Sequence, residues 1–79
     1  MQYKQSLEHS KIKNMIRIQI EYRNGETRQY LPTNWTQILT LSNAPNVQFV
    51  TVYAITPRDF QEYQKKINAQ NLDFMRVVR

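Results

Sequence analysis

Polar and apolar residues alternate along segment 15–23. Ile16, Ile18, Ile20 and Tyr22 fall on one side of this alternation, and Arg17, Gln19, Glu21 and Arg23 on the other. A period of two is typical of a β-strand with one buried and one solvated face. Asn24-Gly25 then favours a type I′ turn, because both residues tolerate positive φ. The pattern predicts a β-hairpin whose second strand ends at Leu31-Pro32, since proline lacks an amide donor.

The charges of this hairpin favour a two-residue loop. That loop gives the cross-strand pairs Arg23–Glu26, Glu21–Arg28, Ile18–Leu31 and Ile20–Gln29. A three-residue loop would instead give Tyr22–Arg28 and Ile20–Tyr30. Only the first register places opposite charges across from each other on the outward face, so we expect the shorter loop.

The rest of the chain predicts two helices and two further strands. Thr33 or Asn34 can cap a short helix with Trp35, Ile38 and Leu39 on one side, ending at 43–46. Segment 47–55 is nearly continuous in β-branched and aromatic residues, which indicates an interior strand covered on most of both faces. Thr56 and Pro57 begin a second helix, with Asp59 in its first turn.

That second helix should bury Phe60, Tyr63 and Ile67 and end near residues 70–71, before a last strand at 72–79. A strand, a helix and a strand form a right-handed crossover, so the last two strands should be parallel. We therefore expect a single small α+β domain over residues 15–79, in the order ββαβαβ. Its mixed four-stranded sheet should carry both helices. Trp35 and Met75 are expected to fill the core, with a ligand platform the alternative for Trp35.

Residues 1–14 are polar and basic, and we interpret them as an N-terminal arm. The segment holds Lys4, Lys11 and Lys13 but no apolar run typical of a secretory signal. No run approaches the roughly 20 apolar residues that span a bilayer, so no membrane association is expected. The chain has no cysteine, which excludes disulfides and thiolate metal sites. We expect a cytoplasmic protein.

The residue inventory argues against catalysis. The only histidine, His9, lies in the predicted arm, and the carboxylates show no metal-ligand spacing. Only Glu62 and Asp73 lack a structural assignment, and two carboxylates on separate elements are a weak basis for acid–base chemistry. A phosphate-binding loop needs several glycines, and the single Gly25 is used by the hairpin. We expect a protein that is not an enzyme and has no cofactor and no metal.

Nucleic-acid binding is the alternative that the charge suggests. The 79 residues carry a net charge of +5. An outward row of Arg17, Arg23 and Arg28 with Tyr30 could meet phosphates while the tyrosine stacks on a base, and the arm lysines would add contacts. The same residues are our candidates for contacting a protein partner. Expected glutamate partners for Arg23 and Arg28 reduce the charge available to phosphates.

Segment 30–41 (YLPTNWTQILTL) resembles a pattern in small phage and prophage proteins. In these a strand runs into Leu-Pro, two polar residues and Trp, as in residues 31–35 here. Such proteins look like virion or tail-assembly components, some with β-grasp folds. This chain departs from the β-grasp layout by placing a second helix before its last strand. The resemblance assigns no functional residues.

Together these features predict a non-catalytic protein-interaction or assembly module that binds a protein partner or self-associates. The resemblance would make it a phage or mobile-element protein, in the host cytoplasm or the virion. A nucleic-acid-binding protein and a phage-encoded inhibitor of a host defence protein are the alternatives. An edge strand or the outward sheet face would bind the partner, and the basic charge would speed association with an acidic one.

Overall fold

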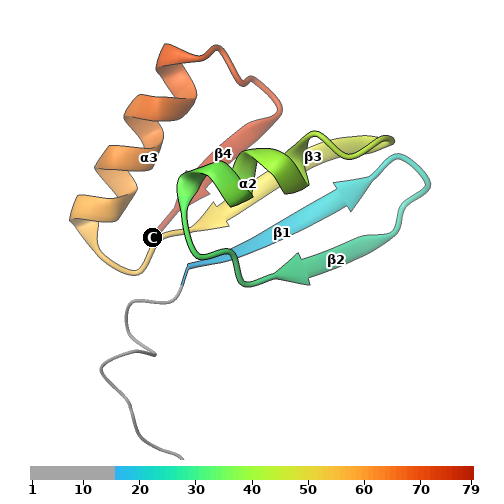
Figure 1. The fold of residues 1–79 in the computed structure, drawn as a ribbon, viewed down its shortest axis with the longest axis horizontal. Helices are drawn as coiled ribbons and strands as arrows, with labels where there is room; N and C mark the ends of the chain where they lie inside the picture. Colours follow the sequence, from blue (N-terminus) through green and yellow to red (C-terminus); the bar gives the residue numbers. More distant parts are fainter. Residues whose placement is uncertain (1–15) are drawn as a thin grey trace, which may run out of the picture.

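A four-stranded mixed sheet with two helices forms the described part of the protein (Figure 1). The computed structural model describes residues 16–79. The elements are β1 (Arg17–Tyr22), β2 (Thr27–Tyr30), α2 (Trp35–Ser42), β3 (Val47–Tyr53), α3 (Pro57–Ala69) and β4 (Met75–Val78). This confirms the α+β class and the ββαβαβ order. The predicted arm, with Lys4, Lys11 and Lys13, lies outside the described residues.

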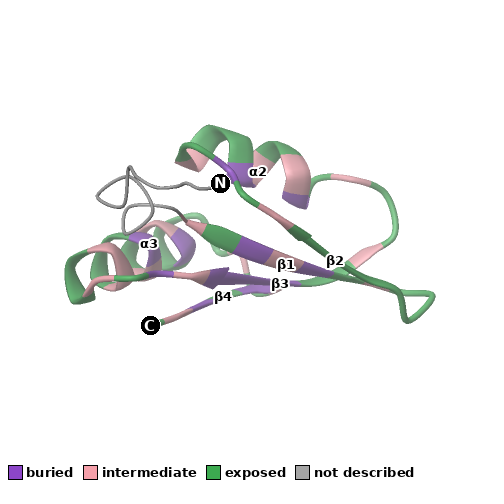
Figure 2. Cartoon of the chain, turned by 90° about the horizontal axis from the view of Figure 1, so that it is seen from below, coloured by how far each residue is buried: buried purple, intermediate pink, exposed green. Residues whose placement is uncertain are grey.

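The strand order is β2-β1-β3-β4. Strand β1 is antiparallel to both β2 and β3, whereas β3 and β4 are parallel as predicted. The connections through α2 and α3 each join parallel strands and step across the sheet in the same direction. Because such crossovers share one hand, both helices should lie on the same face of the sheet. In Figure 2, α2 lies above the sheet and no described element lies below it.

The core lies between that face and the two helices. Every buried apolar strand residue belongs to one side of the pleat, and Ile38 of α2 with Tyr63 and Ile67 of α3 closes over them. The strand contribution is Ile18, Ile20, Val50, Val52, Met75 and Val77. Met75 is therefore a core residue, as predicted. We call this side of the sheet the covered face and the opposite side the open face.

Local sequence signals set the ends of both helices. The Asn34 side chain accepts a hydrogen bond from the Gln37 amide at 2.8 Å, which caps α2. The Thr56 hydroxyl accepts from the Asp59 amide at 3.1 Å, with Pro57 in the first turn of α3 as expected. These caps satisfy amides that have no partner within the helix.

Trp35 joins the two helices. Its ring stacks on Tyr63 with a centroid distance of 5.6 Å, and the Lys66 ammonium lies 5.5 Å from the indole centroid. The half-buried indole packs against the core, as predicted. Its N–H has no hydrogen-bond partner among residues 16–79.

The predicted hairpin register is wrong. Ile18 pairs with Tyr30 and Ile20 with Arg28, which shifts the second strand by one residue from the expected pairing. The Gly25 amide donates to the Tyr22 carbonyl, and the Tyr22 amide to the Glu26 carbonyl, so the loop has three residues, 23–25. Gly25 alone in this loop has positive φ, which excludes a type I′ turn. The geometry is that of a turn followed by a glycine bulge.

Strands β3 and β4 also differ from expectation. Strand β3 is interior, between β1 and β4, but it is not covered on both faces, because Phe49 is 51% exposed. Strand β4 begins at Met75 rather than at residue 72. The Leu72 amide donates to the Ile67 carbonyl and the Met75 amide to the Leu72 carbonyl, so 72–74 form a turn that closes α3.

Candidate interaction surface

The open face is a lattice of side chains set by the strand registers. Three rows cross it. The hairpin row holds Thr27, Glu21, Phe49 and, by extension of the β3–β4 register, Phe74. The middle row holds Gln29, Gln19, Thr51 and Arg76. The far row holds Arg17, Tyr53 and Val78. Leu31 lies beside Arg17 in this row when the β1–β2 register is continued by one residue. Each row runs from β2 through β1 and β3 to β4.

Large apolar side chains are exposed on or beside this face. Leu31 is 59% exposed, Phe49 51% and Ile55 49%, and these are the exposed large hydrophobics of residues 16–79. Phe49 lies in the hairpin row and Leu31 at the end of the far row, whereas Ile55 lies just beyond the end of β3. Single exposed apolar residues are ordinary on a protein surface, but their concentration around one sheet face is a feature of interaction surfaces.

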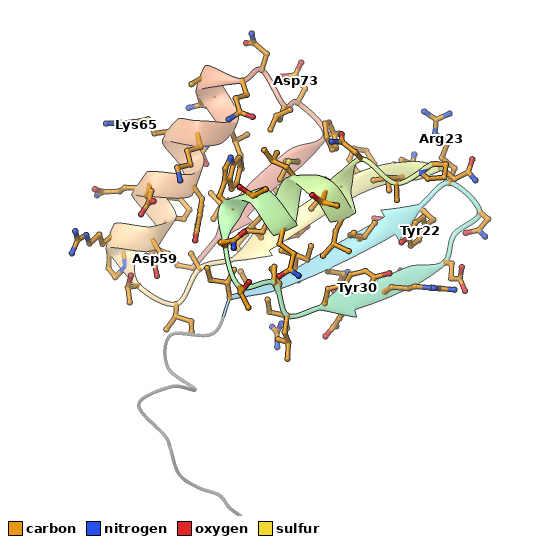
Figure 3. All side chains as sticks on the ribbon, in the orientation of Figure 1. Tyr22, Arg23, Tyr30, Asp59, Lys65 and Asp73 are labelled. Atoms are coloured by element: carbon orange, nitrogen blue, oxygen red, sulfur yellow. The ribbon has the colours of Figure 1, made fainter. Side chains whose placement is uncertain are left out.

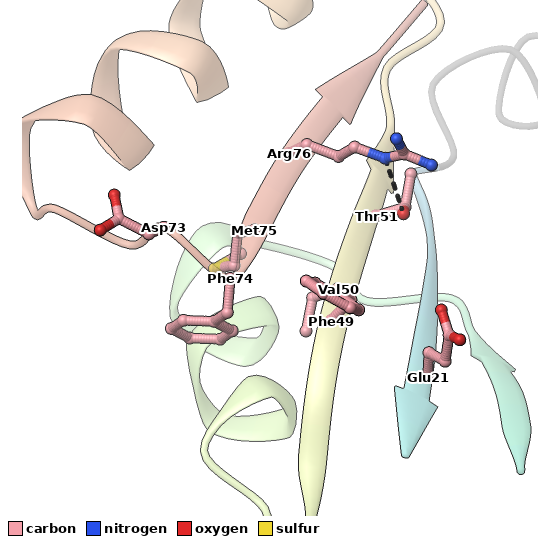
Figure 4. A pocket seen from close by; sticks show the side chains of 8 residues that line it. All are labelled: Glu21, Phe49, Val50, Thr51, Asp73, Phe74, Met75 and Arg76. Atoms are coloured by element: carbon pink, nitrogen blue, oxygen red, sulfur yellow. Dashed lines mark hydrogen bonds between the residues drawn. The ribbon is translucent and has the colours of Figure 1, made fainter. Parts of the chain in front are cut away.

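A shallow hollow of about 360 Å³ opens at the hairpin end of this face. Phe49 and Phe74 line it with Glu21 and Asp73, and Arg76 closes it on the middle row (Figure 4). The Arg76 side chain crosses from β4 toward β3, where its Nε donates to the Thr51 hydroxyl at 3.4 Å. The hollow is therefore lined by two aromatic rings and has charged side chains at its edge.

The charges of the open face are not paired within the described chain. The ion pairs within residues 16–79 are Arg28–Glu26 at 3.5 Å and Lys66–Glu62 at 3.3 Å, and neither includes a residue of the open face. The Arg17 guanidinium lies 4.6 Å from the centroid of the Tyr53 ring, which is a cation–π contact. Arg17, Glu21 and Arg76 are therefore available to a ligand or partner.

The predicted contact row does not exist as one surface. Arg17 is on the open face, but Arg28 and Tyr30 pair with Ile20 and Ile18 and so belong to the other side of the sheet. Arg23 lies in the hairpin loop. The expected pairs Arg23–Glu26 and Glu21–Arg28 are absent in this register. Arg28 instead contacts Glu26, two residues before it in the chain. The register shift therefore separates residues that the sequence pattern predicts on one face.

Tyr22 and Tyr30 meet at the rim of the covered face. Their hydroxyl oxygens are 3.3 Å apart, and the Arg28 guanidinium lies 6.0 Å from the centroid of the Tyr22 ring (Figure 3). This hydroxyl pair raises the pKa of Tyr22 and lowers that of Tyr30, because the group that keeps its proton stabilises the phenolate of the other. Arg28 also favours the Tyr30 phenolate.

Residues 16–79 contain no group of three acidic or histidine side chains able to hold a metal ion. Glu62 pairs with Lys66, and Asp73 lies at the rim of the hollow. None of the helices formed by the same residues is long and apolar enough to cross a membrane.

Sequence reasoning missed Phe49, Tyr53, Phe74 and Arg76 as surface residues. The continuous apolar run of β3 concealed Phe49 and Tyr53, because both faces of that strand read as buried. Phe74 and Arg76 belong to segment 72–79, which also has apolar residues on both faces. A signal was nevertheless present: Phe49, Thr51 and Tyr53 alternate with the smaller Val50 and Val52, and the partner residues on β1 are Arg17, Gln19 and Glu21. Polar partners on the neighbouring strand indicate a solvated face.

Comparison of the chain with protein-family models, with curated proteins and with solved structures gives no match.

Proposed function

We propose that this protein is a non-catalytic interaction module that binds a protein chain on the open face of its sheet. The observation that carries the proposal is the exposure of Leu31 and Phe49 in the lattice, with Ile55 at its border, on a face that no described helix covers. Burying such side chains against a partner removes apolar area from water at roughly 25 cal/mol per Å². An assembly role in a phage particle, with the protein in the host cytoplasm or the virion, extends this proposal through the resemblance of 30–41.

Single-stranded nucleic acid is the second candidate for the same face. It is favoured by Phe49 and Tyr53 on one strand with Arg17 and Arg76 nearby, since bases stack on aromatic rings and arginines meet phosphates. Against it, Glu21 and Asp73 add negative charge beside the rings, and Leu31 is an aliphatic side chain with no π-face for stacking. The mixture of aliphatic, aromatic and both signs of charge favours a protein.

Site-specific photocrosslinking tests the proposal. Photoreactive benzoylphenylalanine in place of Phe49 should crosslink the full chain to a protein in the source cells. The same group in place of Lys65, an exposed residue of α3 that points away from the sheet, is the matched control and should give little product (Figure 3). Equal crosslinking from both positions, or no protein product from position 49, would contradict a docking site on the open face.

Two binding measurements distinguish a protein partner from a nucleic-acid partner. Phe49→Ser should abolish binding of the captured protein, and a labelled single-stranded oligonucleotide should show no binding at low salt. Oligonucleotide binding that weakens steeply with salt and is lost in Arg17→Ala would favour the second candidate.

A further inference from the structure

We infer that the occupant of the open face is a second copy of this chain, packed face to face about a two-fold axis that runs along the middle row. This inference rests on the proposed function and names its partner. Closed two-fold dimers are the commonest protein assemblies, and they require a surface that is complementary to itself. The three rows of the open face meet that requirement.

An axis along the middle row brings the hairpin row of one copy onto the far row of the other. Each strand then lies over its own copy, running in the opposite direction. Along β1, Glu21 meets the partner's Arg17, and along β3, Phe49 meets the partner's Tyr53. At the two sheet edges Phe74 meets Val78, and Thr27 meets Leu31. Opposite charge therefore faces opposite charge on β1, and aromatic or aliphatic groups face each other on β3 and β4.

Glu21 and Arg17 cannot pair with each other within one copy. Glu21 and Arg17 are four residues apart on one strand, which separates their α-carbons by roughly 13 Å. Within residues 16–79 neither forms an ion pair. The two-fold axis produces the Glu21–Arg17 contact twice, since each copy supplies one carboxylate and one guanidinium. The hollow between Phe49 and Phe74 gives these rings room to interdigitate with the side chains of the far row.

The middle row faces itself in this arrangement, and Arg76 is its one unfavourable element. Gln29 and Gln19 can each hydrogen-bond to their own copies, whereas Thr51 is buried beside Arg76. Arg76 itself approaches a like charge at the β4 edge. The effect of Arg76 on affinity therefore distinguishes a second copy from nucleic acid. Removing the Arg76 charge should tighten a face-to-face dimer but weaken binding of a phosphate backbone.

Charge reversal at the two ends of β1 tests the arrangement. The full chain is measured by sedimentation velocity over a micromolar to millimolar series, as wild type, Glu21→Arg, Arg17→Glu and an equimolar mixture of the two variants. We expect a wild-type dimer and, for each variant alone, a dissociation constant raised on the order of tenfold or more, because both symmetric contacts become repulsive. The mixture should recover the dimer, since it restores Glu–Arg contacts at both positions.

Two further variants provide a second test of the arrangement and a control. Arg76→Gln should lower the dissociation constant of the wild-type dimer, and Lys65→Glu on α3 should leave it unchanged. Circular dichroism verifies that each variant is folded, which is expected because the side chains of these four positions are wholly or partly exposed. A wild-type monomer at every concentration, a dimer indifferent to Glu21→Arg, or a mixture that stays monomeric would each overturn the two-fold arrangement.

Failure of this inference can be told apart from failure of the proposed function. If the wild type is monomeric but benzoylphenylalanine at position 49 crosslinks a different protein, the open face is a docking site and its occupant is not a second copy. If the same probe captures neither a second copy nor another protein, both proposals fail. A monomer that binds a single-stranded oligonucleotide through Arg17 and Arg76 would assign the face to nucleic acid.

Discussion

The two faces of the sheet use the same strands for opposite purposes. On the covered face Ile18, Ile20 and Val52 are fully buried beneath α2 and α3. At neighbouring positions of the same two strands, Gln19 beside Ile18 and Phe49 beside Val50 lie on the open face and remain partly or largely exposed. Because neighbouring side chains of a strand point to opposite faces, a single strand can supply both the core and a docking surface.

The two faces also differ in their roles: residues of the covered face stabilise the fold, and residues of the open face are available for binding. Residues of the covered face belong to one contiguous apolar cluster, so changing any of them perturbs the whole domain. Most residues of the open face are exposed or half-buried. Substitutions there should therefore alter association while leaving the fold intact.

The largest effect is expected from a cavity on the covered face. Ile20→Ala removes a fully buried side chain from the centre of the sheet and should lower the free energy of unfolding by about 3 kcal/mol. Gln19→Ala, on the adjacent residue of the open face, should cost less than about 1 kcal/mol. Urea denaturation at equilibrium measures both. Similar losses for the two variants would contradict the division between the faces.

The covered face was largely predictable from the sequence. The alternation of β1, the caps at Thr33–Asn34 and Thr56, and the apolar stripe of α3 all depend on local spacing, and local spacing is visible in a single chain. The parallel β3–β4 pair followed from the crossover rule. These features are determined by interactions within a few residues or by chain connectivity.

The open face could not be predicted, because it depends on register. The choice between two and three loop residues at Asn24-Gly25 shifts β2 by one position and moves Arg28 from one face to the other. Surface charge pairing was a poor guide, since exposed ion pairs contribute little compared with placing Tyr30 against the covered face. The exposure of Phe49 depends on the side to which both helices pack, and its signal, the polar residues of β1 opposite Phe49, Thr51 and Tyr53, is informative only once β1 and β3 are paired in register.

A smaller effect is expected where α2 begins to cover the sheet. Asn34→Ala removes the side chain that caps the Gln37 amide and should lower the free energy of unfolding by about 1 kcal/mol. Thr36→Ala, two residues along on an exposed position of the same helix, is the control and should cost at most a few tenths of a kcal/mol. Equal destabilisation by the two variants would mean that the cap does not hold the helix.

Phe49→Ser should change stability less than Asn34→Ala, by roughly 0.5 kcal/mol, because about half of the ring is already in water. The same variant should abolish self-association, which makes Phe49 the clearest separation of binding from folding in the molecule. Urea denaturation at a concentration where the wild type is monomeric measures the first effect. A loss as large as that of Ile20→Ala would place Phe49 in the core.

The smallest effect is expected at the rim of the covered face, where the Tyr22–Tyr30 hydroxyl pair takes the place of apolar packing. The pair lowers the pKa of Tyr30 below its ordinary value near 10 and raises that of Tyr22 above it. The lowered pKa of Tyr30 contributes stability above the unfolded value that is lost as pH falls through the folded pKa. The raised pKa of Tyr22 contributes stability below the unfolded value that is lost as pH rises through the folded pKa.

Tyr30→Phe removes the partner hydroxyl, so the pKa of Tyr22 should fall back toward its ordinary value. Carbon-13 NMR of the tyrosine rings during an alkaline titration measures each group separately. Tyr63 is the internal control, because its pKa is raised chiefly by burial beneath Trp35 and should not respond to the change at Tyr30. An unchanged pKa for Tyr22 in Tyr30→Phe would show that the two hydroxyls do not interact, and would remove the evidence that β2 closes the covered face with a polar contact.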